Sequence, residues 1–356
     1  MKGKRLRALL MALAMLMTLC GCGSGQTGGE PEQTRIVADS AGRAVEVPEK
    51  IEKVAVTGPM AQMLVFALCP EKLVGVSAAW DTAAREYLDA AYYDLPVLGQ
   101  LYGGHGQLNP ETLLQSGAQV VIDIGEPGDA VAKDMDALSE QMGIPFFHIS
   151  AALDTFGNAC RMLGELLGMP EEAEALAVYC ENAYARSTAI AREAEKVRAI
   201  YVTGDKGLHV IAKGSYHAQV LDMLTDNVAV VDEPSAKGTG NEVDMEQILA
   251  WAPDVILFAP GSIYETVAED PNWKTLPAIA NGTYYEVPAA PCNWMGFPPS
   301  VQRLLGMMWL ETLLYPDAAD FDLKAEVQTY FALFYHCCLT DAQYDALMKN
   351  SIDRKK

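Results

Sequence analysis

The chain has 356 residues, of which 50% are apolar, and its net charge is −21. This high fraction of apolar residues excludes an intrinsically disordered protein. The length allows two domains of ordinary size, each with its own core. The acidic balance disfavours nucleic acid and anionic lipid surfaces as partners, because both carry charge of the same sign. We therefore expect a folded protein that binds no nucleic acid.

The first residues have the pattern of an export signal. Four positive residues (Lys2, Lys4, Arg5 and Arg7) precede an apolar stretch over 9–19, which is too short for a comfortable membrane span. This stretch ends in Leu19-Cys20-Gly21-Cys22, which resembles the bacterial lipobox, whose cysteine is acylated and becomes the mature N-terminus. We predict a lipoprotein signal peptide over 1–21, a lipid on Cys22 and a flexible tether over 22–33. The alternative is an ordinary secretory signal with incidental cysteines.

The rest of the sequence has no second apolar segment of membrane-spanning length, so any transport by this protein needs partners. Six cysteines follow the leader: Cys69, Cys160, Cys180, Cys292, Cys337 and Cys338. Their spacing fits no zinc site, and buried free thiols are the simplest interpretation. Disulfides are nevertheless chemically permitted outside the cytoplasm.

Short β-rich segments alternate with helical patterns from residue 53 onward. A first set of predicted strands lies at 53–56, 73–76, 120–122 and 146–149, and a second set at 199–202, 228–231, 255–258 and 284–287. Buried apolar strands separated by helices indicate parallel sheets in an α/β fold.

Two segments repeat the same arrangement in the two halves. Residues 108–114 lead to the strand at 120–122, and residues 243–249 lead to 255–257 at the same spacing. Each unit has an N-cap residue, Asn109 or Asp244, a glutamate two positions later, a short helix and a buried strand. Glycine-rich loops at 103–106 and 238–240 precede the two units. The repeat predicts two related lobes.

A long amphipathic pattern separates the two sets of strands. It begins near Pro170 and continues to about Val197 with apolar residues at three- and four-residue spacing. A helix of that length reaches from one lobe to the other and permits little hinge motion. We predict an N-terminal α/β lobe over 34–152, connecting helices over 153–197 and a C-terminal α/β lobe over 198–350. A long helix within a single domain is the alternative.

Several segments resemble one known family when their order and spacing are taken together. Residues 39–48, with Ile51 and Lys53-Val54, resemble the opening of class III periplasmic binding proteins for ferric siderophores, haem and cobalamin. Residues 252–256, 273–278 and 282–285 resemble the C-terminal lobe of that family, and 294–309 resembles its iron-complex branch. The resemblance extends from about residue 35 to the end of the chain.

The resemblance implies two Rossmann-like lobes with parallel sheets, a bridging α-helix and a ligand cleft between the lobes. It also implies an extracytoplasmic protein, lipid-anchored to the bacterial cell membrane, that delivers an iron(III)–siderophore or similar chelate to an ABC permease dimer with its ATPase. In this family one acidic residue on each lobe meets arginines of the permease, and Glu111 and Glu246 occupy the matching positions. Glutamates at helix starts are also favoured by the helix dipole alone.

The cleft residues are predicted from the loops that face it in such proteins. These candidates are Trp80, Tyr102, His105, His217, Asn293, Trp294, Phe297 and Arg303. The aromatic side chains suit apolar contact with a chelate, and Arg303 would pair with its negative charge. Direct metal ligands are left open, with His105 and Tyr102 as candidates. Each aromatic residue could instead pack in the core or at the rim, and each histidine could have a structural role. Arg303 could lie on a helix surface.

Three other functions remain as alternatives. A corrinoid or haem carrier has the same fold, and so does a binding protein for bare zinc or manganese, but the five histidines are scattered along the chain. A secreted enzyme is the alternative from another class, and the sequence has no GxSxG, HExxH, P-loop or dinucleotide-binding motif in context. We expect no enzymatic activity and no catalytic cofactor.

Overall fold

The computed structural model describes residues 33–102, 107–126, 128 and 130–352. The predicted signal peptide, Cys22, the tether and His105 lie outside the described residues. Residues 35–356 cluster into one compact unit, and all contacts discussed below lie within it.

The N-terminal half is built on a three-stranded parallel sheet of β3 (Val54–Val56), β4 (Val120–Gly125) and β5 (Phe146–Ser150), in the order β3-β4-β5. The hairpin of β1 (Thr34–Ala38) and β2 (Ala44–Pro48) precedes it. One face of the sheet packs in the largest apolar cluster of the molecule, and the other contacts α4 (Pro110–Ser116) and α5 (Val131–Met142). Burial on both faces explains why these strands are continuously apolar.

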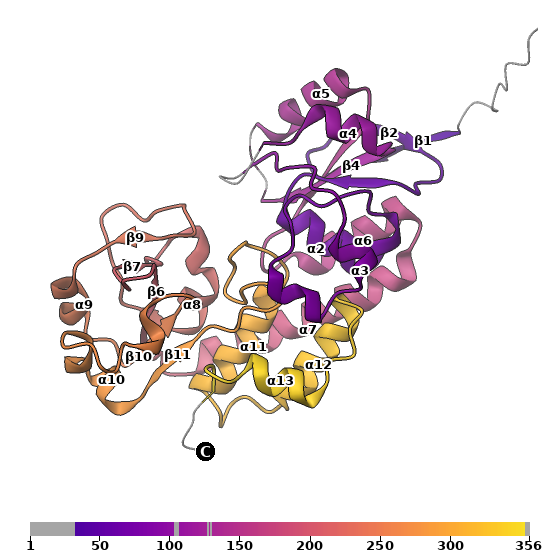
Figure 1. Cartoon of the computed structure of the whole chain (residues 1–356). Coiled ribbons are helices and arrows are strands. Elements are labelled where there is room, and N and C mark those ends of the chain that lie inside the picture. Colours follow the sequence, from indigo (N-terminus) through magenta and orange to yellow (C-terminus); the bar gives the residue numbers. More distant parts are fainter. Residues whose placement is uncertain (1–32, 103–106, 127, 129, 353–356) are drawn as a thin grey trace, which may run out of the picture. The chain divides into compact units, whose positions relative to one another are not determined.

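The C-terminal half contains a six-stranded sheet with the path β11-β10-β6-β7-β9, and β8 pairs with β6. Its strands are β6 (Arg198–Thr203), β7 (His209–Val210), β8 (Asp226–Asn227), β9 (Asn241–Glu242), β10 (Val255–Phe258) and β11 (Tyr284–Glu286). The pairs β8–β6, β6–β10 and β10–β11 are parallel, whereas β7 and β9 add an antiparallel edge. Helices α9 (Met245–Trp251) and α10 (Pro277–Asn281) contribute to the core on one face (Figure 1).

The predicted α/β fold with parallel sheets is therefore confirmed, with two local corrections. The segment 228–231 is not a strand, because the Asn227 side chain accepts from Ala229 N and Val230 N bonds back to Val228 O. The segment 73–76 forms only single bridges, since Leu73 N is used by the preceding turn and Val76 pairs with the segment around Val97.

The long helix α7 (Pro170–Glu193) contacts elements of both halves. It packs against α6 (Phe156–Leu167) and α2 (Pro59–Leu68) of the first half, and against α8 (Gln219–Leu224) and α11 (Arg303–Leu314) of the second. Its 24 residues span about 36 Å at ~1.5 Å per residue. It ends four residues before the predicted Val197, because Ala194 leaves the helical conformation.

The remaining helices complete the layers around the two sheets. They are α3 (Ala90–Tyr93), α12 (Leu323–Phe334) and α13 (Asp341–Leu347), with short 3-10 turns at η1 (Pro70–Lys72), η2 (Thr82–Glu86), η3 (Tyr216–Ala218), η4 (Ile263–Glu265) and η5 (Trp273–Thr275). Helix α12, which follows α11, packs on α2 of the first half and on α11. The chain therefore returns to the first half after completing the second sheet.

Candidate functional site

The carboxyl ends of β3, β4 and β5 lie at one edge of the N-terminal sheet, because the three strands are parallel. Crevices outside the carboxyl ends of parallel strands are the usual ligand sites of α/β folds. Thr57, Glu126 and Ser150 end or follow these strands. They therefore mark the edge of the sheet at which a ligand would be met.

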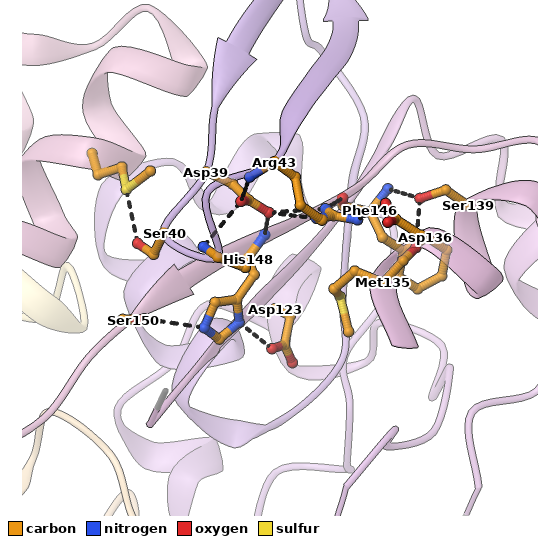
Figure 2. Close-up of polar contacts among 12 residues, drawn as sticks. Asp39, Ser40, Arg43, Asp123, Met135, Asp136, Ser139, Phe146, His148 and Ser150 are labelled. Carbon is orange, nitrogen blue, oxygen red and sulfur yellow. Dashed lines mark hydrogen bonds and ion pairs between the residues drawn. The ribbon is translucent and has the colours of Figure 1, made fainter. Parts of the chain in front are cut away.

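A row of polar side chains crosses this edge, and Figure 2 shows its central members, with the side chains of Asp123, His148 and Ser150 pointing toward one another. Thr57 Oγ1 donates to Asp123 Oδ1, His148 Nδ1 lies 2.7 Å from Asp123 Oδ2, and His148 Nε2 lies 3.2 Å from Ser150 Oγ. Asp123 and His148 are paired in register on β4 and β5 and are buried. The tautomer that carries its proton on Nδ1 fits both contacts, because Nδ1 then donates to the carboxylate and Nε2 accepts from Ser150.

The hairpin of β1 and β2 is hydrogen-bonded to β5, the strand that carries His148. Asp39 accepts hydrogen bonds from Arg43 N and Nε, both at 2.9 Å, and from His148 N at 3.3 Å. Arg43 in turn donates to Phe146 O and forms an ion pair with Asp136 at 3.0 Å (Figure 2). The segment that carries the resemblance at residues 39–48 therefore has a structural role, because it fixes β5.

Of the two predicted cleft residues that the structure describes on the N-terminal half, Tyr102 remains accessible to solvent and Trp80 does not. Its hydroxyl donates to Asp134 Oδ2 at 3.1 Å. Partial burial and this hydrogen bond raise the pKa of the phenol well above its usual value. The phenol therefore stays protonated at neutral pH and is poised as a hydrogen-bond donor.

Arg303 lies at the start of α11 with only 2% of its surface exposed. Its Nη1 donates to Gln219 Oε1 and its Nε to Ser300 O at 3.3 Å, but Nη2 is buried with no hydrogen-bond partner among the described residues. The guanidinium carbon lies 5.6 Å from the ring centroid of Phe156 and 5.7 Å from that of Tyr216. Burial lowers the pKa of Arg303 because a desolvated charge is costly, whereas the nearby Tyr216 hydroxyl and Glu126 carboxylate oppose this shift.

Gln219 joins this cationic site to the N-terminal half. While its side-chain oxygen accepts from Arg303, its Nε2 donates to Glu126 Oε1 at 3.0 Å. Glu126 directly follows β4, whereas Gln219 begins α8. Side chains from both halves therefore meet beside the buried guanidinium.

The loop before α11 brings two further predicted residues together. His217 Nδ1 lies 3.0 Å from Gly296 O, and the rings of His217 and Phe297 are 6.0 Å apart. Phe297 remains 45% exposed, and its ring lies so close to Gly238 that a side chain there would require the ring to move. His217, Phe297 and Arg303 thus form one group around Gly296.

The other predicted residues lie away from solvent. Trp294 is fully enclosed and donates through Nε1 to Ala290 O at 3.3 Å, and Asn293 donates to Tyr201 Oη at 3.0 Å. Trp80 packs edge-on against Phe66 in the main core, and its buried Nε1 has no hydrogen-bond partner within the described part of the chain. Trp80, Asn293 and Trp294 therefore pack in the interior and present little surface to a ligand.

Sequence reasoning missed several residues of this site. Glu126 and Ser150 could have been found, because polar residues directly after buried strands mark the ligand edge of such sheets. Gln219 and Phe156 carry no such signal, since their position depends on how α8 and α6 pack.

The two predicted docking helices present matching surfaces. Asn109 caps α4 by accepting from Glu111 N and Thr112 N, and Asp244 caps α9 within a capping box. Glu111 and Glu246 are exposed. One turn later Leu114 and Leu249 are also exposed, at 52% and 41%. Each helix therefore displays a carboxylate next to an apolar side chain.

Two further observations concern metals and membranes. In the part of the chain that the structure describes, no group of three or more His, Cys, Asp and Glu side chains is placed to hold a metal ion. None of the described helices combines the length and the apolar character needed to span a bilayer.

Comparison with known proteins decides the family. Residues 54–291 match the family model described as periplasmic binding protein, which is more than half of the chain. The chain belongs to this family, the class III periplasmic binding proteins. No curated protein matches the chain.

Solved structures agree with this assignment. The ABC transporter solute-binding protein of Sulfurospirillum deleyianum is 25% identical with a TM-score of 0.80, covering 88% of this chain and 99% of that one. A periplasmic solute-binding protein of Veillonella parvula is 24% identical with a TM-score of 0.75, covering 90% and 98%. The molybdate-bound periplasmic protein MolA of Haemophilus influenzae is 21% identical with a TM-score of 0.65, covering 86% and 99%. The last two likenesses concern the fold alone.

The periplasmic binding protein is thus the extracytoplasmic solute-binding component of an ABC transporter, and it works with a permease and its ATPase. Members of this family are carriers without a catalytic cofactor, so the protein is not an enzyme.

Proposed function

We propose that this periplasmic binding protein captures an anionic metal chelate, an iron(III)–siderophore or a close relative, and delivers it to its permease. The observation that carries the proposal is the buried guanidinium of Arg303 with Nη2 unpartnered among the described residues. A desolvated charge of this kind is costly unless an opposite charge or further acceptors complete its hydrogen bonds. An anionic ligand beside Arg303 supplies both.

The rings around Arg303 favour a chelate over a small oxyanion. Tyr216 flanks the guanidinium, and the exposed Phe297 directly follows Gly296, which lies against the Arg303 side chain. Aromatic surfaces contribute apolar contact area that molybdate, the ligand named for the Haemophilus influenzae relative, cannot use. The combination of one cation with several rings suits the organic periphery of a charged complex. Tyr102 and His217 would add polar contacts at the rim.

A panel of ligands tests this function. We expect a ferric hydroxamate or ferric catecholate to raise the Tm of the purified protein, with smaller or no shifts for haem, cobalamin and molybdate. Arg303→Gln should weaken chelate binding at least tenfold, whereas Arg303→Lys retains part of the affinity. Phe297→Ala, at an exposed position, should weaken binding about fivefold or more without changing the far-UV circular dichroism. A shift with molybdate alone, or unchanged chelate affinity in both Arg303 variants, would reject the proposal.

We further propose that Cys22 carries a lipid that anchors the protein to the outer face of the cell membrane. The support is the Leu19-Cys20-Gly21-Cys22 segment after a positively charged apolar leader. Cys22→Ala should release the protein or leave it unprocessed, since only a thiol accepts the diacylglyceryl group. Detergent partitioning and the mass of the mature N-terminus measure this, and a Cys22→Ala protein that still partitions like wild type would show that the anchor is absent.

Docking on the permease is proposed to use the two equivalent helices α4 and α9. Glu111 and Glu246 would each meet a basic group, and Leu114 and Leu249 would each enter an apolar recess beside it. A two-fold permease dimer offers the same patch twice, so two equivalent surfaces on one chain are what such a partner requires. Charged groups at a docking rim set orientation, and neighbouring apolar side chains add buried area.

A further inference from the structure

Helices α6 and α7 bring two cysteines into the same apolar core. Cys160 lies on α6 and Cys180 on α7, and both are buried. Gly168 ends α6 in a left-handed conformation and α7 begins at Pro170, so the two helices form a tight antiparallel hairpin.

Two close approaches fix how the hairpin is aligned. A side chain at Gly164 would overlap Ala173, and one at Gly157 would overlap the Glu181 side chain. Cys160 lies midway between these two glycines on α6. The part of α7 that lies opposite Cys160 is therefore midway between residues 173 and 181. Cys180 lies on the same face of α7, one turn closer to its C-terminal end.

Both thiols are free in this structure and are buried in the same core. The neighbouring Cys160 thiol, together with burial, raises the pKa of the Cys180 thiol. On the exposed side of the hairpin Arg161 is bound by both Glu174, at 2.6 Å, and Glu181, at 2.5 Å. The helices are thus held together on both sides of the thiol pair.

We propose that Cys160 and Cys180 form a disulfide in the exported protein. Solute-binding proteins of this family act outside the cytoplasm, where disulfides persist. The oxidant is a disulfide of the extracytoplasmic space. One cysteine thiolate attacks it, forming a mixed disulfide and expelling a thiolate; the second cysteine then attacks the mixed disulfide and expels the other. Two electrons and two protons pass to the oxidant, which leaves as two thiols.

The burial of both thiols determines when this reaction can occur. An oxidant cannot reach them in the folded protein, so the bond forms while the hairpin is still exposed during folding. The hairpin depends on contacts that are local in sequence, which form early. The bond closes a loop of about 20 residues and stabilises the fold mainly by restricting the unfolded chain. It also makes α6 and the first half of α7 one rigid piece attached to the N-terminal half.

Thiol counting in the exported, full-length protein tests the proposal. The protein is denatured without reductant, alkylated and digested. We expect a peptide pair linking Cys160 to Cys180, lighter by two hydrogens than the reduced peptides, and alkylation of Cys69, Cys292, Cys337 and Cys338. Full alkylation of both Cys160 and Cys180 would overturn the proposal.

A stability measurement provides a second test. Reductant should lower the Tm of wild type by several degrees in a slow process, but should leave the Tm of the Cys160→Ala/Cys180→Ala double variant unchanged. Cys69→Ala, which alters a buried cysteine outside the pair, should retain the response to reductant. If wild type and the double variant respond equally to reductant, the bond does not exist.

Discussion

The two repeated helix–strand units share a backbone plan but differ in what their strands carry. Both begin with a capped helix that exposes a glutamate and a leucine, and both continue into a buried parallel strand. Asp123 of β4 and Phe258 of β10 occupy equivalent places. Asp123 contacts Thr57 and His148, whereas Phe258 packs against Tyr264, Trp273 and Tyr284.

The two halves therefore differ in which elements carry the polar side chains near the candidate site. The N-terminal half carries polar groups on the sheet itself, with Ser150 at the end of the row. The C-terminal sheet is apolar at the equivalent place, so its polar contributions come from helices and loops, chiefly Gln219 and Arg303. The two units share an exposed surface, which agrees with the proposed docking on a two-fold permease, and they differ at the sheet positions nearest the candidate site.

Charge reversal should have the largest effect, because it acts on the feature that the two units share. Glu111→Arg and Glu246→Arg should each abolish uptake and ligand-stimulated ATP hydrolysis in reconstituted vesicles, since like charges replace attraction at the docking face. Ligand affinity should stay within about twofold. Leu114→Gln and Leu249→Gln should reduce stimulation by a smaller factor.

Glu171→Arg provides a matched control for this experiment. Glu171 follows Pro170 at the start of α7 just as Glu111 follows Pro110 at the start of α4, and it is also exposed. Its reversal should leave transport intact. Normal transport by the Glu111→Arg/Glu246→Arg double variant would show that these glutamates only favour their helix starts.

Substitutions at the equivalent strand positions test the difference between the units. Asp123→Ala leaves His148 and Thr57 without their shared acceptor, and should lower the free energy of unfolding by about 3–5 kcal/mol. Phe258→Ala should cost a similar ~3–5 kcal/mol by leaving a cavity. The conservative changes separate the two: Asp123→Asn should still cost about 1–3 kcal/mol, but Phe258→Leu less than ~1.5 kcal/mol. Urea unfolding followed by circular dichroism measures all four, and a loss below ~1 kcal/mol for Asp123→Ala would refute the polar row.

The smallest effect is expected at the contact between α7 and α11, where the stability of the fold should depend on pH. Burial raises the pKa of Glu311 on α11 to about 7, against the opposing effects of the Ser187 hydroxyl, which donates to it, and of Arg186. Glu326 also faces this site and holds Arg186 through an ion pair of 3.1 Å. The folded protein therefore binds a proton more tightly than the unfolded chain.

The sign of the pH effect follows from this raised pKa. Between the unfolded pKa of 4.5 and about 7, stability should fall as pH rises, by about 1–3 kcal/mol in total. Glu311→Gln should remove this slope and be more stable than wild type at pH 8. Urea unfolding at pH 5 and pH 8 measures it, and identical slopes for the two proteins would contradict the assignment to Glu311.

Local signals in the sequence predicted the elements that repeat or that carry strong periodicity. The N-caps Asn109 and Asp244 located α4 and α9 because a short polar side chain before an apolar helix satisfies free backbone amides. Pro170 located the start of α7 for a similar reason. The prediction of a strand at 228–231 was wrong. Its four apolar residues fit a strand, but the Asn227 side chain accepts a hydrogen bond from Ala229 N and the backbone turns away from β6.

The candidate site was predicted less completely than the fold. The predicted residues His217, Phe297 and Arg303 lie together, but Trp294 and Trp80 lie inside the protein, where their rings pack. Composition and loop position cannot separate an aromatic residue that faces a ligand from one that faces the core. Both need a large apolar ring next to a polar loop.

The sequence by itself determined the α/β class, the two related units, the long helix and the two exposed glutamates, because each depends on periodicity or capping within a few consecutive residues. Only the tertiary structure decided that Arg303 is buried with Nη2 unpartnered among the described residues, that Gln219 joins it to Glu126, and that Cys160 and Cys180 lie in one core. These arrangements join residues far apart in the chain through the packing of α6, α7, α8 and α11. Their chemistry arises from desolvation, which depends on what surrounds a side chain and not on its neighbours in sequence.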